Sequence, residues 1–116
     1  MKWFAAVLFT LANLALAGRA FGADDATIQK GQNVYEYWCA TCHGPGLPGT
    51  VALETKYKGA KPALLIERTD LIPPVTKTFV RKGVSVMPFF RKTEIGDADL
   101  DALAAYLARN NKAQNR

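Results

Sequence analysis

Apolar residues recur every three or four positions in three stretches of this chain, a spacing that places them on one face of a helix. The first stretch follows Asp24 and carries Ile28, Gly31, Val34, Tyr35, Trp38 and Cys39. The second follows Pro73 and Pro74 and carries Val75, Phe79 and Val80 before Gly83. The third starts at Asp97 and carries Leu100, Leu103, Ala104 and Leu107. This pattern predicts helices from residue 24 into residues 39–43, over 74–82, and from 97 to 109–112.

The ends of these stretches carry residues that start and stop helices. Asp24 and Thr27 suit the cap and first turn of the first helix, and Asp97 suits the N-cap of the last. Proline and glycine alternate over residues 44–49, which predicts a loop. Residues 50–61 show no clean period, so we expect irregular chain there and a short helix from Pro62.

No segment alternates apolar and polar residues as a half-buried strand does, and no internal repeat appears. The expected fold is all-α, with three to five helices and long loops around one core. With 116 residues, the chain has room for a single domain.

The N-terminus has the pattern of a secretory signal peptide. An apolar run over residues 3–17 follows Lys2. Small residues at the positions that a signal peptidase recognises allow cleavage after Ala17 or after Gly22, and we favour Gly22. The run is short for a membrane span, so we expect removal of residues 1–22 and a periplasmic domain at 23–116 without stable membrane insertion. A retained anchor is the alternative. Removal of residues 1–22 takes away Lys2 and Arg19 and leaves a small positive net charge, which does not indicate nucleic-acid binding.

Residues 39–43 read Cys-Ala-Thr-Cys-His and carry the clearest chemical signal. Two thiols at this spacing can each form a thioether to a haem vinyl group, and the histidine that follows then binds the iron. The sequence therefore predicts one covalent haem c attached at Cys39 and Cys42, with His43 as an axial ligand. A small core with a large buried cofactor also agrees with the chain length.

Three other uses of such a motif are a zinc site, a redox-active dithiol and a plain disulfide. A structural zinc site needs four ligands, and the chain has two cysteines and one histidine. A thioredoxin-like redox pair is expected beside a βαβ unit, and no strands are predicted. A plain disulfide accounts for both cysteines but leaves His43 without a role.

The composition restricts the second axial ligand. His43 is the only histidine, and Met87 is the only methionine other than Met1. Met87 lies between Gly83 and Pro88 in a predicted loop, and histidine with methionine is an established ligand pair in cytochromes c. We therefore expect Met87 to bind the iron, although a lone methionine also serves as a gap filler in cores.

Three motifs in order resemble class I cytochromes c over the whole chain after residue 22. The motifs are the glycine-tyrosine pair before the haem motif (Gly31, Tyr35), Met87 followed by Pro88, and Leu-Ala-Ala-Tyr-Leu at residues 103–107. The resemblance implies that the last helix crosses the first at Gly31, with Tyr106 near that glycine. It also implies that a proline carbonyl accepts the proton of His43 Nδ1, and Pro45 and Pro48 are both candidates.

Residues 87–95 (Met-Pro-Phe-Phe-Arg-Lys-Thr-Glu-Ile) are similar to the small cytochrome subunit of alkylphenol-oxidising flavocytochromes, such as p-cresol methylhydroxylase and eugenol hydroxylase. That resemblance implies electron transfer from a flavoprotein dehydrogenase subunit to the haem. A freely diffusing respiratory cytochrome is the near alternative. A haem enzyme or gas sensor requires an open iron face, and no distal acid-base pair accompanies the motif.

The side chains around Met87 suggest how a partner is recognised. Basic residues gather there, and two interpretations are open: a ring of positive charge around the haem edge that steers an acidic partner, or an ordinary solvated surface. They are Lys56, Lys58, Lys61, Lys77, Arg81, Lys82, Arg91 and Lys92. The nearby aromatic residues favour packing around the porphyrin over a dedicated electron path. They are Trp38, Phe79, Phe89 and Phe90, and the two adjacent phenylalanines suit a dry contact with a bound subunit.

Overall fold

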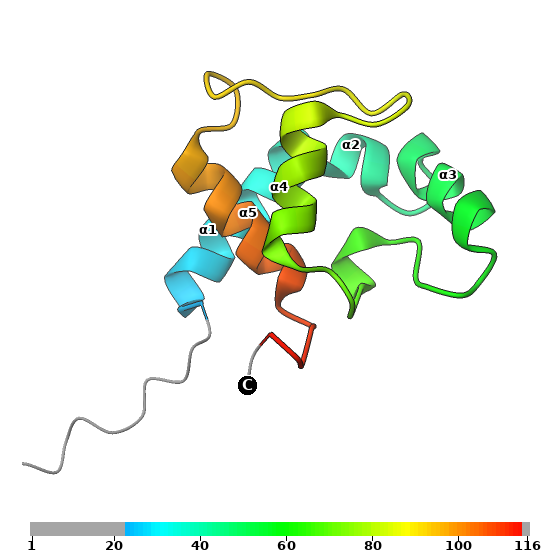
Figure 1. The fold of residues 1–116 in the computed structure, drawn as a ribbon, viewed down its shortest axis with the longest axis horizontal. Coiled ribbons are helices and arrows are strands. Elements are labelled where there is room, and N and C mark those ends of the chain that lie inside the picture. The colour runs from blue at the N-terminus through cyan, green and yellow to red at the C-terminus, as the bar shows by residue number, and fades with distance from the viewer. Residues whose placement is uncertain (1–22, 115–116) are drawn as a thin grey trace, which may run out of the picture.

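The computed structural model describes residues 23–114, so the predicted signal peptide at residues 1–22 lies outside the described residues. Five α-helices form this part of the chain (Figure 1): α1 (Asp25–Trp38), α2 (Ala40–His43), α3 (Pro48–Tyr57), α4 (Pro73–Lys82) and α5 (Asp97–Ala108). A 3-10 turn spans Leu65–Glu67. Within residues 23–114, the β-type pairing consists of one isolated bridge between Val84 and Met87. The all-α prediction is confirmed.

The helix ends follow from local chemistry, with one correction to the sequence-based expectation. The backbone N–H of Thr27 donates to Asp24 Oδ1 at 2.7 Å, so Asp24 is the N-cap of α1 as expected. At α5 the N-cap is Gly96, and Asp97 is the first helical residue. The Asp97 carboxylate instead accepts hydrogen bonds from Lys92 and Arg81, which hold the pKa of Asp97 below its usual range.

The segment between residues 44 and 72 differs from the prediction. Helix α3 starts at Pro48, inside the predicted loop, and runs to Tyr57 through chain expected to be irregular. Proline is favoured at the first helical turn, where its missing N–H costs nothing. Thr50 is the buried residue of α3, so the helix has no apolar face whose period a sequence could show. The helix predicted from Pro62 is wrong, and a 3-10 turn follows three residues later.

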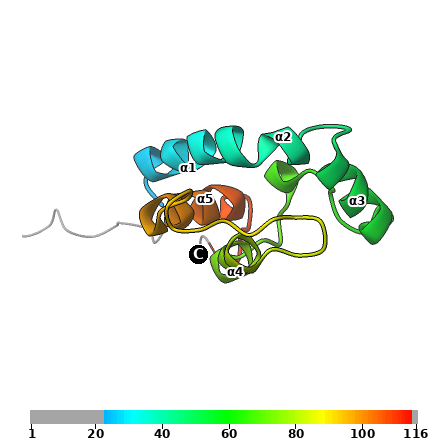
Figure 2. The same ribbon diagram turned by 90° about the horizontal axis from the view of Figure 1, so that it is seen from above.

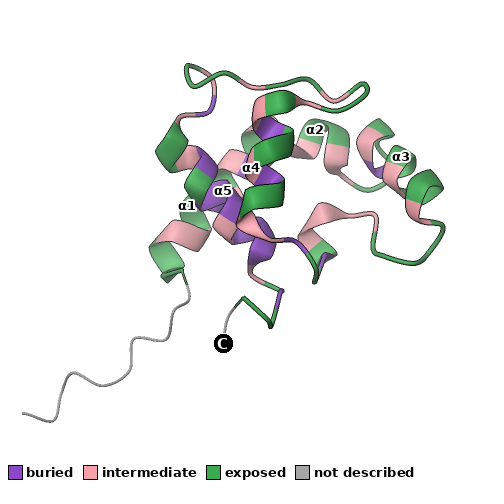
Figure 3. Ribbon diagram, in the orientation of Figure 1, coloured by how far each residue is buried: buried purple, intermediate pink, exposed green. Residues whose placement is uncertain are grey.

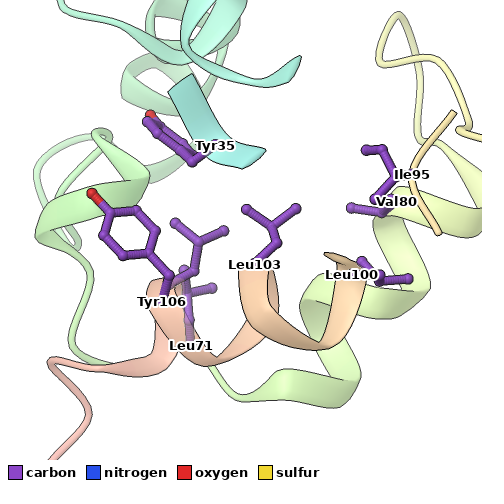
Figure 4. Packing of buried hydrophobic residues seen from close by; sticks show 8 residues of the cluster. Tyr35, Leu71, Val80, Ile95, Leu100, Leu103 and Tyr106 are labelled. Carbon is purple, nitrogen blue, oxygen red and sulfur yellow. The ribbon is translucent and has the colours of Figure 1, made fainter. Parts of the chain in front are cut away.

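The core lies where α1 and α4 pack against α5 (Figures 1 and 2). Most of α5 is buried, and the purple colour in Figure 3 is concentrated on that helix. The buried apolar cluster consists of Tyr35, Leu71, Val80, Ile95, Leu100, Leu103, Tyr106 and Leu107. Figure 4 shows Tyr35 of α1 and Tyr106 of α5 on one side of this cluster and Val80 and Ile95 on the other.

Gly31 makes the close approach of α1 to α5 possible. A Cβ atom built on Gly31 would lie 2.1 Å from the carbonyl oxygen of Ala102 and 2.6 Å from Tyr106 Cβ. Just beside it, the rings of Tyr35 and Tyr106 pack with centroids 5.8 Å apart. The crossing of the first and last helices that the class I resemblance implied is confirmed.

The long segment before α4 is tied to the C-terminal end of α5. Asn110 and Arg109 both donate to the Ile66 carbonyl, and Asn111 donates to the Leu71 carbonyl at 3.0 Å. Within the segment, the buried guanidinium of Arg68 donates to both carboxylate oxygens of Asp70. These bonds hold the pKa of the Asp70 carboxyl below its usual range. These polar bonds, together with the packing of Leu65, Ile66 and Leu71 in the core, fix the path of this segment.

Across residues 23–114, none of the helices combines the length and the apolar character needed to cross a membrane.

The Gly31 contact generates a stability prediction. Gly31→Ala should lower the free energy of unfolding by about 1–3 kcal/mol through overpacking, although alanine is normally the better helix former by up to about 1 kcal/mol. Asn33→Ala is the control, because it places alanine at an exposed position of the same helix and so reports its helix propensity without the close contact. Urea unfolding of both variants measures the difference. Equal stability of the two would contradict the close approach.

Candidate functional site

The Cys-Ala-Thr-Cys-His motif forms one tight turn after a break in the helix. Helix α1 ends at Trp38, Cys39 adopts φ −112°, and α2 covers the rest of the motif. The single helix predicted through residues 39–43 is therefore interrupted. The Cys39 carbonyl accepts from the N–H groups of both Cys42 (3.1 Å) and His43 (2.9 Å). This turn places both thiols and the imidazole on one short piece of backbone.

The two cysteines are free thiols with different surroundings. Cys42 is exposed, whereas Cys39 is half-buried against the core. Burial, and to a smaller extent Cys42, raises the pKa of Cys39 to about 12. A thioredoxin-like pair depends on a thiol whose pKa is lowered, so this environment disagrees with the thioredoxin interpretation.

The imidazole of His43 is held with one nitrogen turned inward. Nδ1 is fully buried and has no hydrogen-bond partner, and the backbone of Gly49 covers it. A Cβ on Gly49 would lie 3.1 Å from Nδ1. Burial also lowers the pKa of His43, which favours the neutral imidazole that binds metals. The structure shows no bond from Nδ1 to Pro45 or Pro48, so it assigns the expected accepting role to neither proline.

Tyr35 is a site residue whose role the sequence did not show. Its hydroxyl donates to the His43 carbonyl at 3.1 Å and so ties α1 to the end of the motif. Tyr35 is 5% exposed, and burial is the main reason that its pKa rises to about 12, so the donor proton is retained. The apolar period correctly placed Tyr35 on the core face. The direction of its hydroxyl depends on the break at Cys39, which the period does not predict.

Met87 lies in the loop between α4 and α5. Its backbone and that of Val84 exchange hydrogen bonds of 3.1 and 2.9 Å, which closes a tight turn with Ser85 at φ 53°. Met87 is half-buried and packs against the same core cluster as Cys39. Trp38, next to the motif, meets Phe90 edge to face at 5.8 Å. This ring pair joins the two segments that carry the predicted axial ligands.

These residues fit a haem c with histidine and methionine as axial ligands. Cys39 and Cys42 offer free thiols on one turn, and the burial of His43 Nδ1 leaves Nε2 as the nitrogen for a metal. Met87 supplies the thioether that such a site uses. A closed zinc site lacks ligands in this part of the chain, because no group of three or more His, Cys, Asp or Glu side chains within 23–114 is arranged to hold a metal.

Comparison with known proteins supports this chemistry. Residues 26–107 match the family described as cytochrome c oxidase, cbb3-type, subunit III. The chain belongs to this family. It is 34% identical over 100 residues to the cbb3-type cytochrome c oxidase subunit CcoP of Azospirillum sp. (strain B510). The matched region covers 81% of this chain but 31% of that relative. No solved structure matches the chain.

Membership of the cbb3-type subunit III family makes the chain a c-type cytochrome domain, which implies haem c and electron transfer. The class I resemblance agrees with this at the level of the domain. The finer resemblance to alkylphenol flavocytochromes receives no support from the family or from the relative.

The basic residues of this cytochrome domain form a weaker ring than the sequence suggested. Five of the eight are paired with carboxylates, largely those of α5. These are Lys61, Lys77, Arg81, Arg91 and Lys92. Within residues 23–114, Lys56, Lys58 and Lys82 form no ion pair. The local net charge is therefore much smaller than the count of basic residues implies.

The aromatic residues divide into two groups. Trp38 and Phe90 are half-buried and in contact, as expected for packing. Phe79 and Phe89 are exposed to 42% and 61%, so other protein side chains do not cover them, and their contact with the porphyrin stays a prediction. Because Phe90 points inward, Phe89 is the member of the adjacent pair that is available for a surface contact.

The motif generates a prediction about haem attachment. Protein matured in cells that have a c-type haem-attachment system should keep its haem on a denaturing gel, because two thioether bonds survive unfolding. Cys39→Ala and Cys42→Ala should each leave one bond, and the double variant should leave none. Haem staining of the gel and the intact mass measure this. Haem from the unaltered chain that extracts into acidified organic solvent would contradict covalent attachment.

Proposed function

We propose that this domain is a single-electron carrier with one haem c, bonded to Cys39 and Cys42 and axially ligated by His43 Nε2 and Met87. The bound haem supplies the chemistry, a change of the iron between its ferric and ferrous states. The observation that carries the proposal is the turn at residues 39–43, which fixes both thiols and leaves the His43 Nδ1 buried. Residues 1–22 would direct the chain to the periplasm, where c-type maturation takes place.

The protein contributes position and environment more than chemistry. Tyr35 holds the backbone carbonyl of His43, and the backbone of Gly49 lies close to its imidazole. Trp38, Phe90 and the core cluster place apolar groups beside the motif. A thioether ligand and an apolar surrounding both favour ferrous iron, so the proposed site has a raised reduction potential.

Substitution of Met87 tests the axial ligand. The ferric protein should show the weak far-red band of a sulfur-to-iron charge transfer. Met87→Ala should abolish the band, let imidazole or cyanide bind the iron, and lower the reduction potential, because a soft thioether stabilises ferrous iron. Optical spectra and a redox titration measure these effects, with Val86→Ala in the same turn as the control. A Met87→Ala spectrum that equals the unaltered one would show that another group binds the iron.

We propose a respiratory oxidase as the first candidate partner, because the relative with 34% identity is a subunit of a cbb3-type oxidase. The contact would centre on the exposed apolar side chains of the Met87 loop. Val84, Val86 and Phe89 are 48%, 90% and 61% exposed. Interface centres are apolar and depleted in charge, and the pairing of most nearby basic residues agrees with this. A flavoprotein dehydrogenase remains the second candidate, on the similarity of residues 87–95.

Transfer kinetics distinguish apolar docking from charge steering. Steering predicts rates that fall steeply as salt approaches physiological strength, where screening acts over about 8 Å. We instead expect a shallow salt dependence, a large loss of rate in Phe89→Ser and Val86→Ser, and a small loss in Lys82→Gln. Stopped-flow oxidation of the ferrous protein by a purified cbb3-type oxidase measures these rates. A steep salt dependence together with a strong Lys82→Gln effect would favour a steered, diffusing carrier. Co-purification with a larger flavoprotein would favour the second candidate.

A further inference from the structure

Arg81 connects two segments that are remote in sequence. It lies in the last turn of α4, and its side chain is 22% exposed. Nη1 donates to the Phe90 carbonyl at 3.1 Å, and Nη2 donates to Asp97 Oδ1 at 2.9 Å. The other oxygen of Asp97 accepts from Lys92 at 2.7 Å. One guanidinium thus joins the end of the Met87 loop to the first turn of α5.

The same loop is closed onto α4 at both ends. At its start, Gly83 has φ +67°, and a Cβ there would lie 2.7 Å from the Met87 carbonyl oxygen. At its end, the N–H of Phe90 donates to the Val80 carbonyl at 2.8 Å, and Arg81 holds the Phe90 carbonyl. Both backbone polar groups of Phe90 are therefore held by α4, three residues after Met87.

Side-chain packing holds Met87 and Phe90 against the core cluster but does little to hold their neighbours. Val86 is 90% exposed, and Phe89 is 61% exposed. Hydrogen bonds therefore add to the packing of Met87 and Phe90 as a restraint on the path of the backbone between them. Among these bonds, those of Arg81 come from a charged donor, and such bonds are stronger than neutral ones.

We propose that Arg81 is a positioning residue for Met87, holding the Phe90 carbonyl so that the loop keeps the thioether at the iron. This inference rests on the proposed ligand role of Met87. Without the guanidinium, the Phe90 carbonyl loses its partner and the end of the loop is released from α5. The loop then opens more often, and exogenous ligands reach the iron more easily.

The experiment uses the full holoprotein and four variants. Arg81→Leu removes both contacts, Arg81→Lys retains the charge, and Asp97→Asn weakens the anchor on α5 but leaves the Phe90 contact. Lys77→Leu is the matched control, because the Lys77–Asp101 ion pair also joins α4 to α5 but does not touch the loop. Imidazole affinity, the far-red band, the reduction potential and urea unfolding are measured for each.

We expect Arg81→Leu to bind imidazole about tenfold more tightly or more, the scale of losing a hydrogen bond from a charged donor. Its far-red band should weaken and its potential should fall, with partial recovery in Arg81→Lys and a smaller effect in Asp97→Asn. Lys77→Leu should retain the unaltered values. If Arg81→Leu does not fold, Arg81→Lys and Asp97→Asn still report on the two contacts.

Equal imidazole affinity and equal bands in the Arg81 variants and in Lys77→Leu would overturn the inference, even if both lose stability. Such a result would mean that Arg81 only joins two helices. Absence of the far-red band from the unaltered protein would instead overturn the proposed function, so the two failures are distinguishable.

Discussion

The close approach of α1 and α5 at Gly31 is the constraint on which the site depends. The two helices can meet there only because no side chain separates α1 from the Ala102 carbonyl. That contact places Tyr35 in the core beside Tyr106, and the Tyr35 hydroxyl then holds the His43 carbonyl. Tyr35, eight positions before the histidine, thus couples the position of the helix crossing to the position of the motif. Loss of the crossing would loosen His43 without any change in the motif itself.

The two predicted axial ligands are held by different kinds of interaction. His43 lies on a turn fixed by backbone bonds to Cys39 and by burial of its ring against Gly49. Met87 lies on a loop with exposed neighbours, and the loop is held at its ends by α4. One ligand is therefore fixed by a local turn, and the other by the packing of its own side chain together with the hydrogen bonds of a loop whose neighbouring side chains are exposed. Differences in iron ligation between variants should arise mainly on the methionine side.

Sequence reasoning succeeded where a residue type determines its own role. The haem motif is local, the histidine is unique, and α1, α4 and α5 have apolar faces that a period shows. It failed at α3, which buries Thr50 and so has no such face. It also could not place the carboxylates of α5 beside the basic residues, because these pairs join segments far apart in the chain.

That pairing changes the argument about partners. The sequence shows an excess of basic residues near Met87, and alone this favours recognition by long-range attraction. In the fold, Asp97 faces Arg81 and Lys92, and Asp101 faces Lys77, so much of the charge is used within the molecule. An attraction between surface charges is already weak at physiological salt, and paired charges weaken it further. The exposed apolar side chains of the Met87 loop are not engaged by such pairs, so the fold agrees better with the proposed docking by short-range apolar contact than with steering by charge.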